Sequence, residues 1–453
     1  MVKINKNKSF ELEKQAILPG SRILKTKNTK NRIDYFIENI ENNYSFKNTN
    51  LFKSKSELIN KFKKYRQEWN EQPNKIIENH KYAKNIKNII AQENILPLCI
   101  DLEVASICDL ACPHCFREYL ATPDKIIDLE FAKKTIKEAS LNGVKSIKFN
   151  WRGEPLLNPN LPDLIKYAKD VGIIETIINT NATNLTEKKS LELINSGLDY
   201  MIYSFDGGTK KTYEKLRPGR FKKNNFERII KNIKDFKSVR EKNKSKFPYT
   251  KIQMVLMESN RHEVESFKEL FDDYVDEVTV TLYSERGGSL NDLPKDKKNK
   301  LENYLSDNNL DKNTPYMFDG EGNLFISKKR KTCKQIFQRL MVTYDGKVGM
   351  CCLDWGAKHN LGYLSKKAFS SQKEELKILE NIKNKKKGFD LLKNAVLPET
   401  YNNPIKKISK IKDLWNGLEL NKVREMHLNN KIDDIDVCKN CNSKDTFVWE
   451  KID

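Results

Sequence analysis

Strand-like and helix-like patterns of apolar residues alternate along the middle of the chain. Short apolar runs predict buried strands, and between them apolar residues recur at helical spacing. The predicted strands are Cys99–Val104, Ser146–Asn150, Glu175–Thr180, Tyr200–Phe205, Lys251–Met257 and Glu277–Leu282. The predicted helices are Leu129–Leu141, Leu161–Asp170, Glu187–Asn195, Lys210–Leu216, Phe226–Val239 and Glu263–Tyr274. This alternation favours a parallel sheet with right-handed crossovers, an α/β fold that forms a partial, TIM-like (β/α)6 barrel.

Helical patterns precede this core. A capping box at residues 54–57 starts a helix, which we expect to end at Pro73. A second helical pattern runs through residues 76–90. Residues 1–50 have little periodicity, so we expect partial order there, with one helical face over residues 35–40.

The C-terminal third predicts a smaller α+β domain. Leu340–Tyr344 and Lys347–Cys351 predict a β-hairpin with a type I′ turn at Asp345-Gly346, and Leu414–Leu428 predicts a helix. The polar residues before this domain predict a linker, and the Lys-rich residues 365–412 predict a surface insertion. The expected parts are an N-terminal helical extension (1–94), the barrel core (95–288), a linker (289–331) and the C-terminal domain (332–453).

Composition bounds the class of protein. A chain of 453 residues is long enough for two or three domains. Its net charge of +21 comes mostly from Lys mixed with Asn, Ile and Glu, which is typical of a compositional bias and leaves only the expectation of an anionic substrate or partner. We find no signal-peptide pattern and no apolar run of membrane-spanning length. The clustered cysteines therefore indicate metal ligands in a cytoplasmic protein.

Three cysteines lie directly after the first predicted strand. Cys108, Cys112 and Cys115 have C-x3-C-x2-C spacing, and thiolates are preferred ligands of iron–sulfur clusters and zinc. Three thiolates leave one iron of a four-iron cluster open, whereas zinc needs a fourth ligand, for which His114 is the local candidate. A third alternative, inert core cysteines, is disfavoured by the polar residues around them.

This stretch resembles the signature of the radical S-adenosylmethionine (SAM) superfamily. The resemblance implies a [4Fe–4S] cluster held by Cys108, Cys112 and Cys115, with SAM chelating the open iron. It implies that an electron from the cluster cleaves SAM and that the 5′-deoxyadenosyl radical abstracts a substrate hydrogen. It also implies an external electron donor such as flavodoxin or ferredoxin.

Polar motifs follow the next three strands, where a barrel places its chemistry. Residues 151–155, Trp-Arg-Gly-Glu-Pro, resemble the family's G-G-E-P motif with an Arg in place of the first Gly, which implies that Gly153 and Glu154 hold the SAM amino group. The motifs after the next two strands resemble contacts to the SAM carboxylate and ribose. Their candidate residues are Asn179, Asn181, Ser204 and Asp206. An ordinary turn is the alternative for each motif.

Two arginines are candidates for contacting an anionic substrate. Arg286 follows the sixth strand and Arg220 follows the fourth, and a guanidinium group can clamp a phosphate or carboxylate with two hydrogen bonds. The alternative is that each is a solvated surface arginine. No residue is predicted to carry out the chemistry on the substrate itself.

A second set of cysteines lies in the C-terminal domain. The order Cys333, Cys351, Cys438, Cys441 resembles the auxiliary-cluster domains called SPASM and, in the reduced single-cluster form, twitch. The resemblance implies a second [4Fe–4S] cluster, and four protein ligands suit electron transfer. Cys352 is an alternative to Cys351, because adjacent strand residues point to opposite faces. A structural zinc site is the alternative for the domain.

Three functions are compatible with the sequence. The first is a radical SAM enzyme acting on a small anionic molecule, such as a sugar or nucleotide-sugar. The second is a peptide-modifying maturase, although residues 51–94 are helical in pattern rather than like a winged-helix leader-binding domain. The third is a non-catalytic metal-binding module that contacts nucleic acid, which lacks the interleaved aromatic and basic pattern of single-strand binders. The sequence does not indicate the oligomeric state.

Overall fold

The computed structural model describes most of the chain. The described residues are 22–24, 32–43, 54–83, 85–92, 95–115, 117, 123–257, 259–282, 303, 305–307, 316–318, 324–354, 357, 359–368, 374, 377–378, 408–439, 441 and 446–452. Arg286 and most of the expected linker and Lys-rich insertion lie outside the described residues. No described helix is long and apolar enough to cross a membrane.

A ten-stranded sheet organises the fold, in the order β1-β7-β6-β5-β4-β3-β2-β10-β11-β12. Its centre consists of six parallel strands, which are neighbours in chain order. They are β2 (Cys99–Leu102), β3 (Ser146–Lys148), β4 (Glu175–Thr180), β5 (Tyr200–Ser204), β6 (Tyr249–Leu256) and β7 (Glu277–Leu282). The expected partial (β/α)6 barrel is therefore confirmed. At its edge β1 (Arg22–Leu24) pairs antiparallel with β7, a strand that the sequence pattern did not predict.

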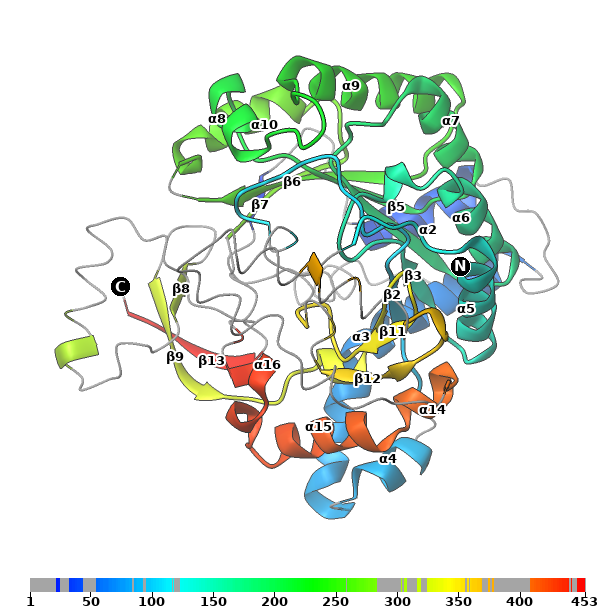
Figure 1. Cartoon of the computed structure of the whole chain (residues 1–453), viewed down its shortest axis with the longest axis vertical. Helices are drawn as coiled ribbons and strands as arrows, with labels where there is room; N and C mark the ends of the chain where they lie inside the picture. Colours follow the sequence, from blue (N-terminus) through cyan, green and yellow to red (C-terminus); the bar gives the residue numbers. More distant parts are fainter. Residues whose placement is uncertain are drawn as a thin grey trace.

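Helices cover the outer face of this sheet (Figure 1). They are α5 (Leu129–Leu141), α6 (Leu161–Asp170), α7 (Glu187–Asn195), α8 (Lys210–Leu216), α9 (Phe226–Lys242) and α10 (Val264–Phe271), with short 3-10 turns η2 (Pro155–Leu157) and η3 (Arg261–Glu263). Side-chain caps start several of them: Asp128 accepts a hydrogen bond from the Phe131 amide at α5, and Thr186 accepts one from the Lys189 amide at α7. Their apolar faces and the strands form one continuous core.

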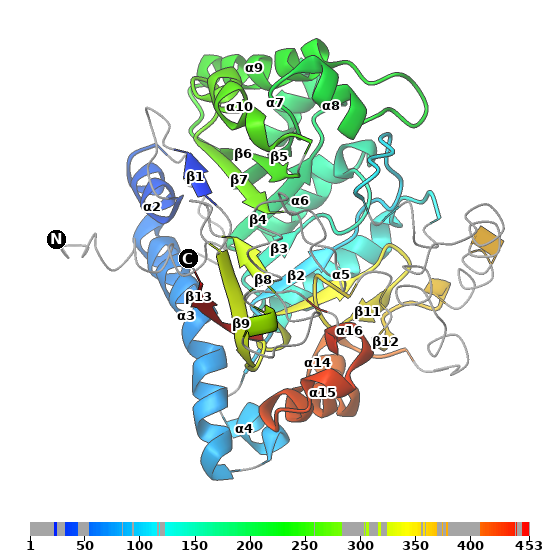
Figure 2. The ribbon, with the colours of Figure 1, turned by 90° about the vertical axis from the view of Figure 1, so that its left-hand side faces the viewer.

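After β1, the described N-terminal residues form three helices that pack against the barrel. They are α2 (Arg32–Asn43), α3 (Lys55–Ala83) and α4 (Ile86–Gln92). The predicted face at residues 35–40 is confirmed, because Phe36 of α2 is buried and its ring stacks on Phe62 of α3 with centroids 3.8 Å apart. The expected end of α3 at Pro73 is wrong: Figure 2 shows α3 as one long helix that runs down the molecule to α4.

The reason that α3 passes Pro73 lies in the C-terminal domain. Proline has no amide hydrogen, so the Trp69 carbonyl loses its donor within the helix. The Gln338 side chain donates to this carbonyl at 2.5 Å and replaces the missing bond. The neighbouring Gln72 side chain donates to the Phe337 carbonyl at 2.7 Å. The irregular turn of the helix is thus a docking point between distant segments.

The predicted hairpin extends the barrel sheet. Strand β10 (Arg339–Val342) pairs in parallel with β2, and β11 (Lys347–Gly349) and β12 (Asn360–Tyr363) follow it antiparallel. The predicted type I′ turn is wrong, because it needs positive φ at two residues and only Gly346 has it, at +98°. The Thr343 hydroxyl accepts from the Lys347 amide and donates to the Asp345 carboxylate, which closes a longer loop.

The remaining elements form a separate small sheet and a helical layer. The sheet, on the left in Figure 1, has the order β13-β9-β8. Two of its strands, β8 (Tyr316–Phe318) and β9 (Leu324–Arg330), lie within the segment predicted as a linker, and β9 pairs with β13 (Phe447–Lys451). The helical layer comprises η4 (Gln335–Phe337), α14 (Ile411–Trp415), α15 (Leu418–Leu428), η5 (Ile432–Asp434) and α16 (Asp436–Lys439). The one helix predicted over 414–428 is two, separated at Asn416-Gly417.

Candidate active site

The loop after β2 carries the first three thiols. Cys112 is buried, Cys108 and Cys115 are half-buried, and the Cys115 amide donates to the Cys112 carbonyl at 2.9 Å. All nine cysteines are free thiols. Burial raises the pKa of the Cys108 thiol well above its ordinary value and that of Cys112 to about 12. Burial thus favours the neutral thiols, and a bound metal or cluster would supply the positive charge that favours thiolates.

The segment after β3 lies directly against this loop. Gly153 has φ of +69°, and a Cβ atom there would lie 2.3 Å from the Ala105 carbonyl oxygen and 2.6 Å from that of Ile107. Only glycine permits so close an approach with this backbone conformation. The next amide, that of Glu154, donates to the Ile107 carbonyl at 2.8 Å. The glycine of the motif thus fixes the distance between the two segments.

Arg152, which stands where the family motif has glycine, is accommodated by a buried ion pair. Its guanidinium group donates to both carboxylate oxygens of Glu103, at 2.6 and 2.9 Å, and lies over the Trp151 ring at 4.9 Å. Both charged side chains are nearly inaccessible to solvent. A two-pronged pair of this kind has a defined geometry, so the substitution adds a brace between β2 and β3.

The Glu154 carboxylate is buried at the centre of the site. Its Oε1 accepts from the Leu156 amide at 3.0 Å and the Thr180 hydroxyl at 2.7 Å, and its Oε2 accepts from the Asn181 amide at 2.8 Å. Burial and the charge of Asp109 raise the pKa of Glu154 to about 7, although the hydrogen bonds oppose this. The segment after β3 and the end of β4 therefore meet at one buried carboxylate.

Asn181 links the end of β4 to the cysteine loop. Its side-chain amide donates to Asp109 at 2.8 Å and lies 3.9 Å from the Cys108 sulfur. Asp109 also accepts from the Thr183 hydroxyl and from the Asn184 side chain. The sequence analysis missed Asp109, whose partners lie more than seventy positions away in the chain. The network holds Cys108 and Asp109 against the segment that follows β4.

The residues present fit SAM and a cluster at this edge of the sheet. Asn179 hydrogen-bonds through its backbone amide to Asn150, while its buried side-chain Oδ1 has no partner among the described residues. A buried acceptor without a donor is costly and indicates a position for a ligand donor. Ser204 ends β5 at the same edge and is half-buried.

Asp206 joins three elements around the cysteine loop. Its Oδ2 accepts from Arg217 at 2.7 and 2.8 Å and lies 3.0 Å from Nε2 of His114, and its Oδ1 accepts from the Val255 amide at 2.8 Å. Burial would raise the pKa of Asp206, but Arg217 and His114 hold it below its usual range. Asp206 is thus an ionised brace. Arg217 was missed by the sequence analysis.

The structure describes only one of the two arginines that were predicted to contact the substrate, Arg220. Arg286 lies outside the described residues. Arg220 pairs with Asp124 at 2.7 Å, and its backbone amide donates to the Asp109 carbonyl at 2.8 Å. The adjacent Gly219 forms an antiparallel bridge with Leu110. The segment around Arg220 therefore braces the cysteine loop.

The second set of thiols converges from three segments of the C-terminal domain. Cys333 follows β9, Cys351 follows β11, Cys438 lies in α16, and the Cys441 amide donates to the Cys438 carbonyl at 3.0 Å. Burial raises the pKa of Cys351 and of Cys438, and their neighbouring cysteines add to both shifts. No three of the described His, Cys, Asp and Glu side chains are placed to hold a single metal ion.

Cys352 points away from this group. Its thiol donates to the Gln335 side chain at 2.9 Å, and its side chain packs on the small apolar cluster of Trp151, Met341 and Ala357. Its carbonyl accepts from the Trp151 indole at 3.2 Å. Cys438 and Cys441 are among the groups that raise the pKa of Cys351, so the Cys351 thiol lies near both of them. The geometry therefore favours Cys351 as the ligand.

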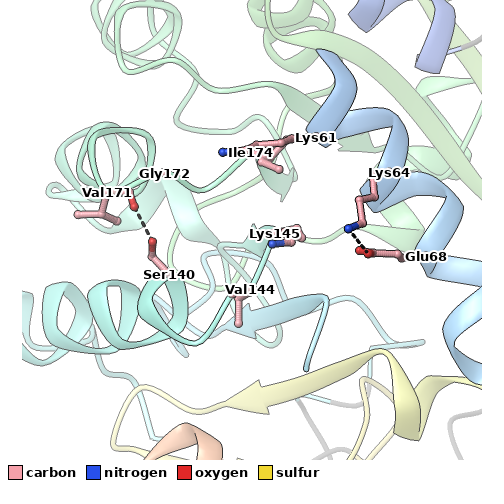
Figure 3. A pocket seen from close by; sticks show the side chains of 10 residues that line it. Lys61, Lys64, Glu68, Ser140, Val144, Lys145, Val171, Gly172 and Ile174 are labelled. Atoms are coloured by element: carbon pink, nitrogen blue, oxygen red, sulfur yellow. Dashed lines mark hydrogen bonds and ion pairs between the residues drawn. The ribbon is translucent and has the colours of Figure 1, made fainter. Parts of the chain in front are cut away.

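A pocket of about 300 Å³ lies at the opposite edge of the barrel (Figure 3). It lies between α3 and the turns that precede β3 and β4, with Lys61, Lys64 and Lys145 on its rim. Lys61 pairs with Glu57 and Lys64 with Glu68, both within α3. Because the chemistry of such barrels takes place at the carboxyl ends of the strands, this pocket is not the active site.

Comparison with known protein families agrees with the two cysteine sites. Residues 102–271 match the profile of the radical SAM superfamily, and residues 333–387 match the SPASM iron–sulfur cluster-binding domain. The two matches contain the loop of Cys108–Cys115 and three of the C-terminal cysteines, Cys333, Cys351 and Cys352.

The curated relatives match part of their length. GTP 3′,8-cyclase of Chlorobaculum tepidum is 29% identical over 134 residues, 30% of this chain and 39% of the relative. PqqA peptide cyclase of Bradyrhizobium diazoefficiens is 34% identical over 113 residues, 25% of this chain and 29% of the relative. The chain thus spans less than half of either relative. Among solved structures, BtrN in complex with AdoMet and 2-DOIA is 17% identical, with 78% of this chain and 99% of that chain covered and a TM-score of 0.41.

Proposed function

We propose that this chain, an enzyme with a radical SAM domain followed by a SPASM cluster-binding domain, acts on a small anionic substrate of the sugar or nucleotide-sugar class. The cofactors of these domains are SAM and [4Fe–4S] clusters. When bound, they supply reductive cleavage of SAM and abstraction of a substrate hydrogen by the 5′-deoxyadenosyl radical. The observation that carries the proposal is the cysteine loop locked against Gly153 and Glu154.

The residues around this loop have separate roles in the proposal. Cys108, Cys112 and Cys115 hold the first cluster. Glu154 accepts a hydrogen bond from the SAM amino group. Its Oε2 has one donor among the described residues and keeps a free lone pair for this bond. The buried Oδ1 of Asn179, which has no partner in the described part of the chain, accepts a hydrogen bond from a second ligand donor. Asn181, Ser204 and Asp206 orient the ligand or the loop.

Two observations support the proposed substrate class: the net charge of the chain and the name of one relative. The net charge of +21 favours an anionic substrate. The name of the Chlorobaculum tepidum relative states that GTP, an anionic nucleotide, is its substrate. Arg286 is kept as the candidate that contacts the substrate anion, whereas the brace formed by Arg220 and Asp124 makes Arg220 the weaker candidate.

The second cysteine set has a proposed role in electron transfer. Cys333, Cys351, Cys438 and Cys441 would hold an auxiliary cluster with no open iron, which suits a relay of electrons rather than chelation of substrate. An external donor such as flavodoxin or ferredoxin would reduce the first cluster.

A peptide substrate is the second candidate. The observation that favours it is the match to a relative named PqqA peptide cyclase, at 34% identity. The described elements between residues 54 and 92 are the helices α3 and α4, and a winged-helix leader-binding domain would include strands. This feature favours the small-molecule proposal.

Formation of 5′-deoxyadenosine tests the proposed function. Anaerobically reconstituted protein should release it after reduction, and Cys112→Ala should abolish release. Cys99→Ala, in the same sheet but not in the loop, is the matched control. Full activity of Cys112→Ala would exclude the proposed cluster. Nucleotide-sugars and candidate precursor peptides can then be compared by how strongly each stimulates 5′-deoxyadenosine formation.

A further inference from the structure

A buried histidine lies beside the second cysteine set and is not explained by the ligand assignment. His427 belongs to α15 and is 1% exposed. Its Nδ1 accepts a hydrogen bond from the Cys333 backbone amide at 3.3 Å, and its Nε2 lies 3.4 Å from the Cys438 sulfur. One imidazole ring therefore contacts two of the four proposed ligand residues, which come from opposite ends of the domain.

The contacts determine where the ring carries its proton. A backbone N–H only donates, so Nδ1 must be the unprotonated, accepting nitrogen. A neutral imidazole then carries its hydrogen on Nε2. That hydrogen is directed at the Cys438 sulfur, which is a weak acceptor as a thiol and a stronger one as a thiolate. Thr332 fixes the helix end, because its hydroxyl donates to the His427 carbonyl at 3.0 Å.

We propose that His427 is a positioning residue of the auxiliary cluster, whose Nε2–H donates to the Cys438 thiolate and raises the reduction potential of that cluster. The inference rests on the proposed ligand set of Cys333, Cys351, Cys438 and Cys441. Hydrogen bonds to ligand sulfur are among the factors that set cluster potentials. A donor stabilises negative charge on sulfur, and the reduced cluster carries more of it, so the bond favours reduction.

The potential of the auxiliary cluster tests this directly. Full-length protein with Cys108→Ala, Cys112→Ala and Cys115→Ala retains only the second cluster, and redox titration followed by electron paramagnetic resonance gives its potential. His427→Leu removes the donor and should lower the equilibrium constant for reduction about tenfold, a shift of about 59 mV for one electron. His427→Gln places an amide donor near the Nε2 position and should restore most of the shift.

Controls separate this role from simple packing. His262→Leu alters a histidine whose side chain is 72% exposed and should leave the potential unchanged. Equal shifts in His427→Leu and His427→Gln, or no shift in His427→Leu, would overturn the inference. If both variants lose iron, the triple-cysteine protein that keeps His427 decides. When this protein contains 15N-labelled histidine, electron paramagnetic resonance of its reduced cluster should show a weak coupling to nitrogen. Absence of this coupling would also overturn the inference.

Iron analysis distinguishes failure of the inference from failure of the proposed function. About four irons in the triple-cysteine protein support the ligand set. Zinc or no metal in that protein would refute the proposed auxiliary cluster itself. Four irons with an unshifted potential would refute only the role of His427.

Discussion

Replacement of Glu154 by glutamine should weaken SAM binding by about 1.5–3 kcal/mol, which is roughly ten- to 140-fold in affinity. Glu154 is 2% exposed, so its interactions are little screened by water. Its Oε1 already accepts two hydrogen bonds, whereas Oε2 accepts one among the described residues. Glutamine keeps the shape but removes the charge and replaces one acceptor with an NH2 donor.

The same residue predicts a pH dependence. Burial and Asp109 raise the pKa of Glu154 from its ordinary value of 4.5 to about 7. A carboxyl group with a raised pKa contributes its stability below the unfolded-state pKa and loses it as the pH rises through about 7. A bound ammonium group favours the ionised carboxylate, so SAM binding should release a proton below this pH. SAM affinity should therefore rise between about pH 5 and 7 and level off above it.

Calorimetric titration of the cluster-reconstituted protein with SAM measures both effects. Glu154→Gln should bind more weakly and lose the pH dependence, with its iron content unchanged. Glu227→Gln is the matched control, because Glu227 is an exposed carboxylate that pairs with Lys210 on the outer helices. Equal affinities and parallel pH profiles for the two proteins would show that Glu154 only braces the strand ends.

Three further predictions concern the two cysteine sites and the docking of helix α3. Gly153→Ala places a Cβ 2.3 Å from a carbonyl oxygen of the cysteine loop and should cost about 1–3 kcal/mol in urea unfolding and lower the iron content; unchanged iron would contradict the close packing. Cys438→Ala should lose about half of about eight irons, whereas Cys352→Ala should keep them; an equal loss of iron in the two variants would contradict the exclusion of Cys352 as a ligand. Gln338→Leu leaves the Trp69 carbonyl without its donor and should lower the free energy of unfolding by about 1–3 kcal/mol, and an unchanged denaturation midpoint would refute that role.

The strands and helices of the barrel were predictable because each of them has a pattern in its own stretch of sequence. The strands are short buried runs, and the helices have one apolar face and a capping residue, as Asp128 provides for α5. Four predicted helices, α5 to α8, have the same bounds in the structure. The polar strand ends that carry Glu154 and Asn181 follow from that order, since parallel strands end at one edge.

What was missed depends on contacts between distant segments. Strand β9 is a mixed polar run, and it forms a strand because β13, more than a hundred residues later, pairs with it. Helix α3 continues through Pro73 because Gln338 supplies the missing donor. His427 resembles any helical histidine until α15 is packed against the second cysteine set. Local patterns contain no information about such partners.

The two cysteine sites are joined by one continuous sheet, because the hairpin of the C-terminal domain is part of the barrel sheet. Strand β10 lies beside β2, the strand that leads into the first cysteine loop. Glu103, at the end of β2, accepts from Arg152 and from the Tyr344 amide of the hairpin loop at 3.2 Å. The Trp151 indole donates to the carbonyl of Cys352, the residue next to Cys351. The segment that holds Glu154 is therefore linked to the second domain directly through Trp151 and indirectly through Arg152 and Glu103. These bonds hold the described residues of the two cysteine sites in one arrangement, which is what the proposed relay of electrons between two clusters requires.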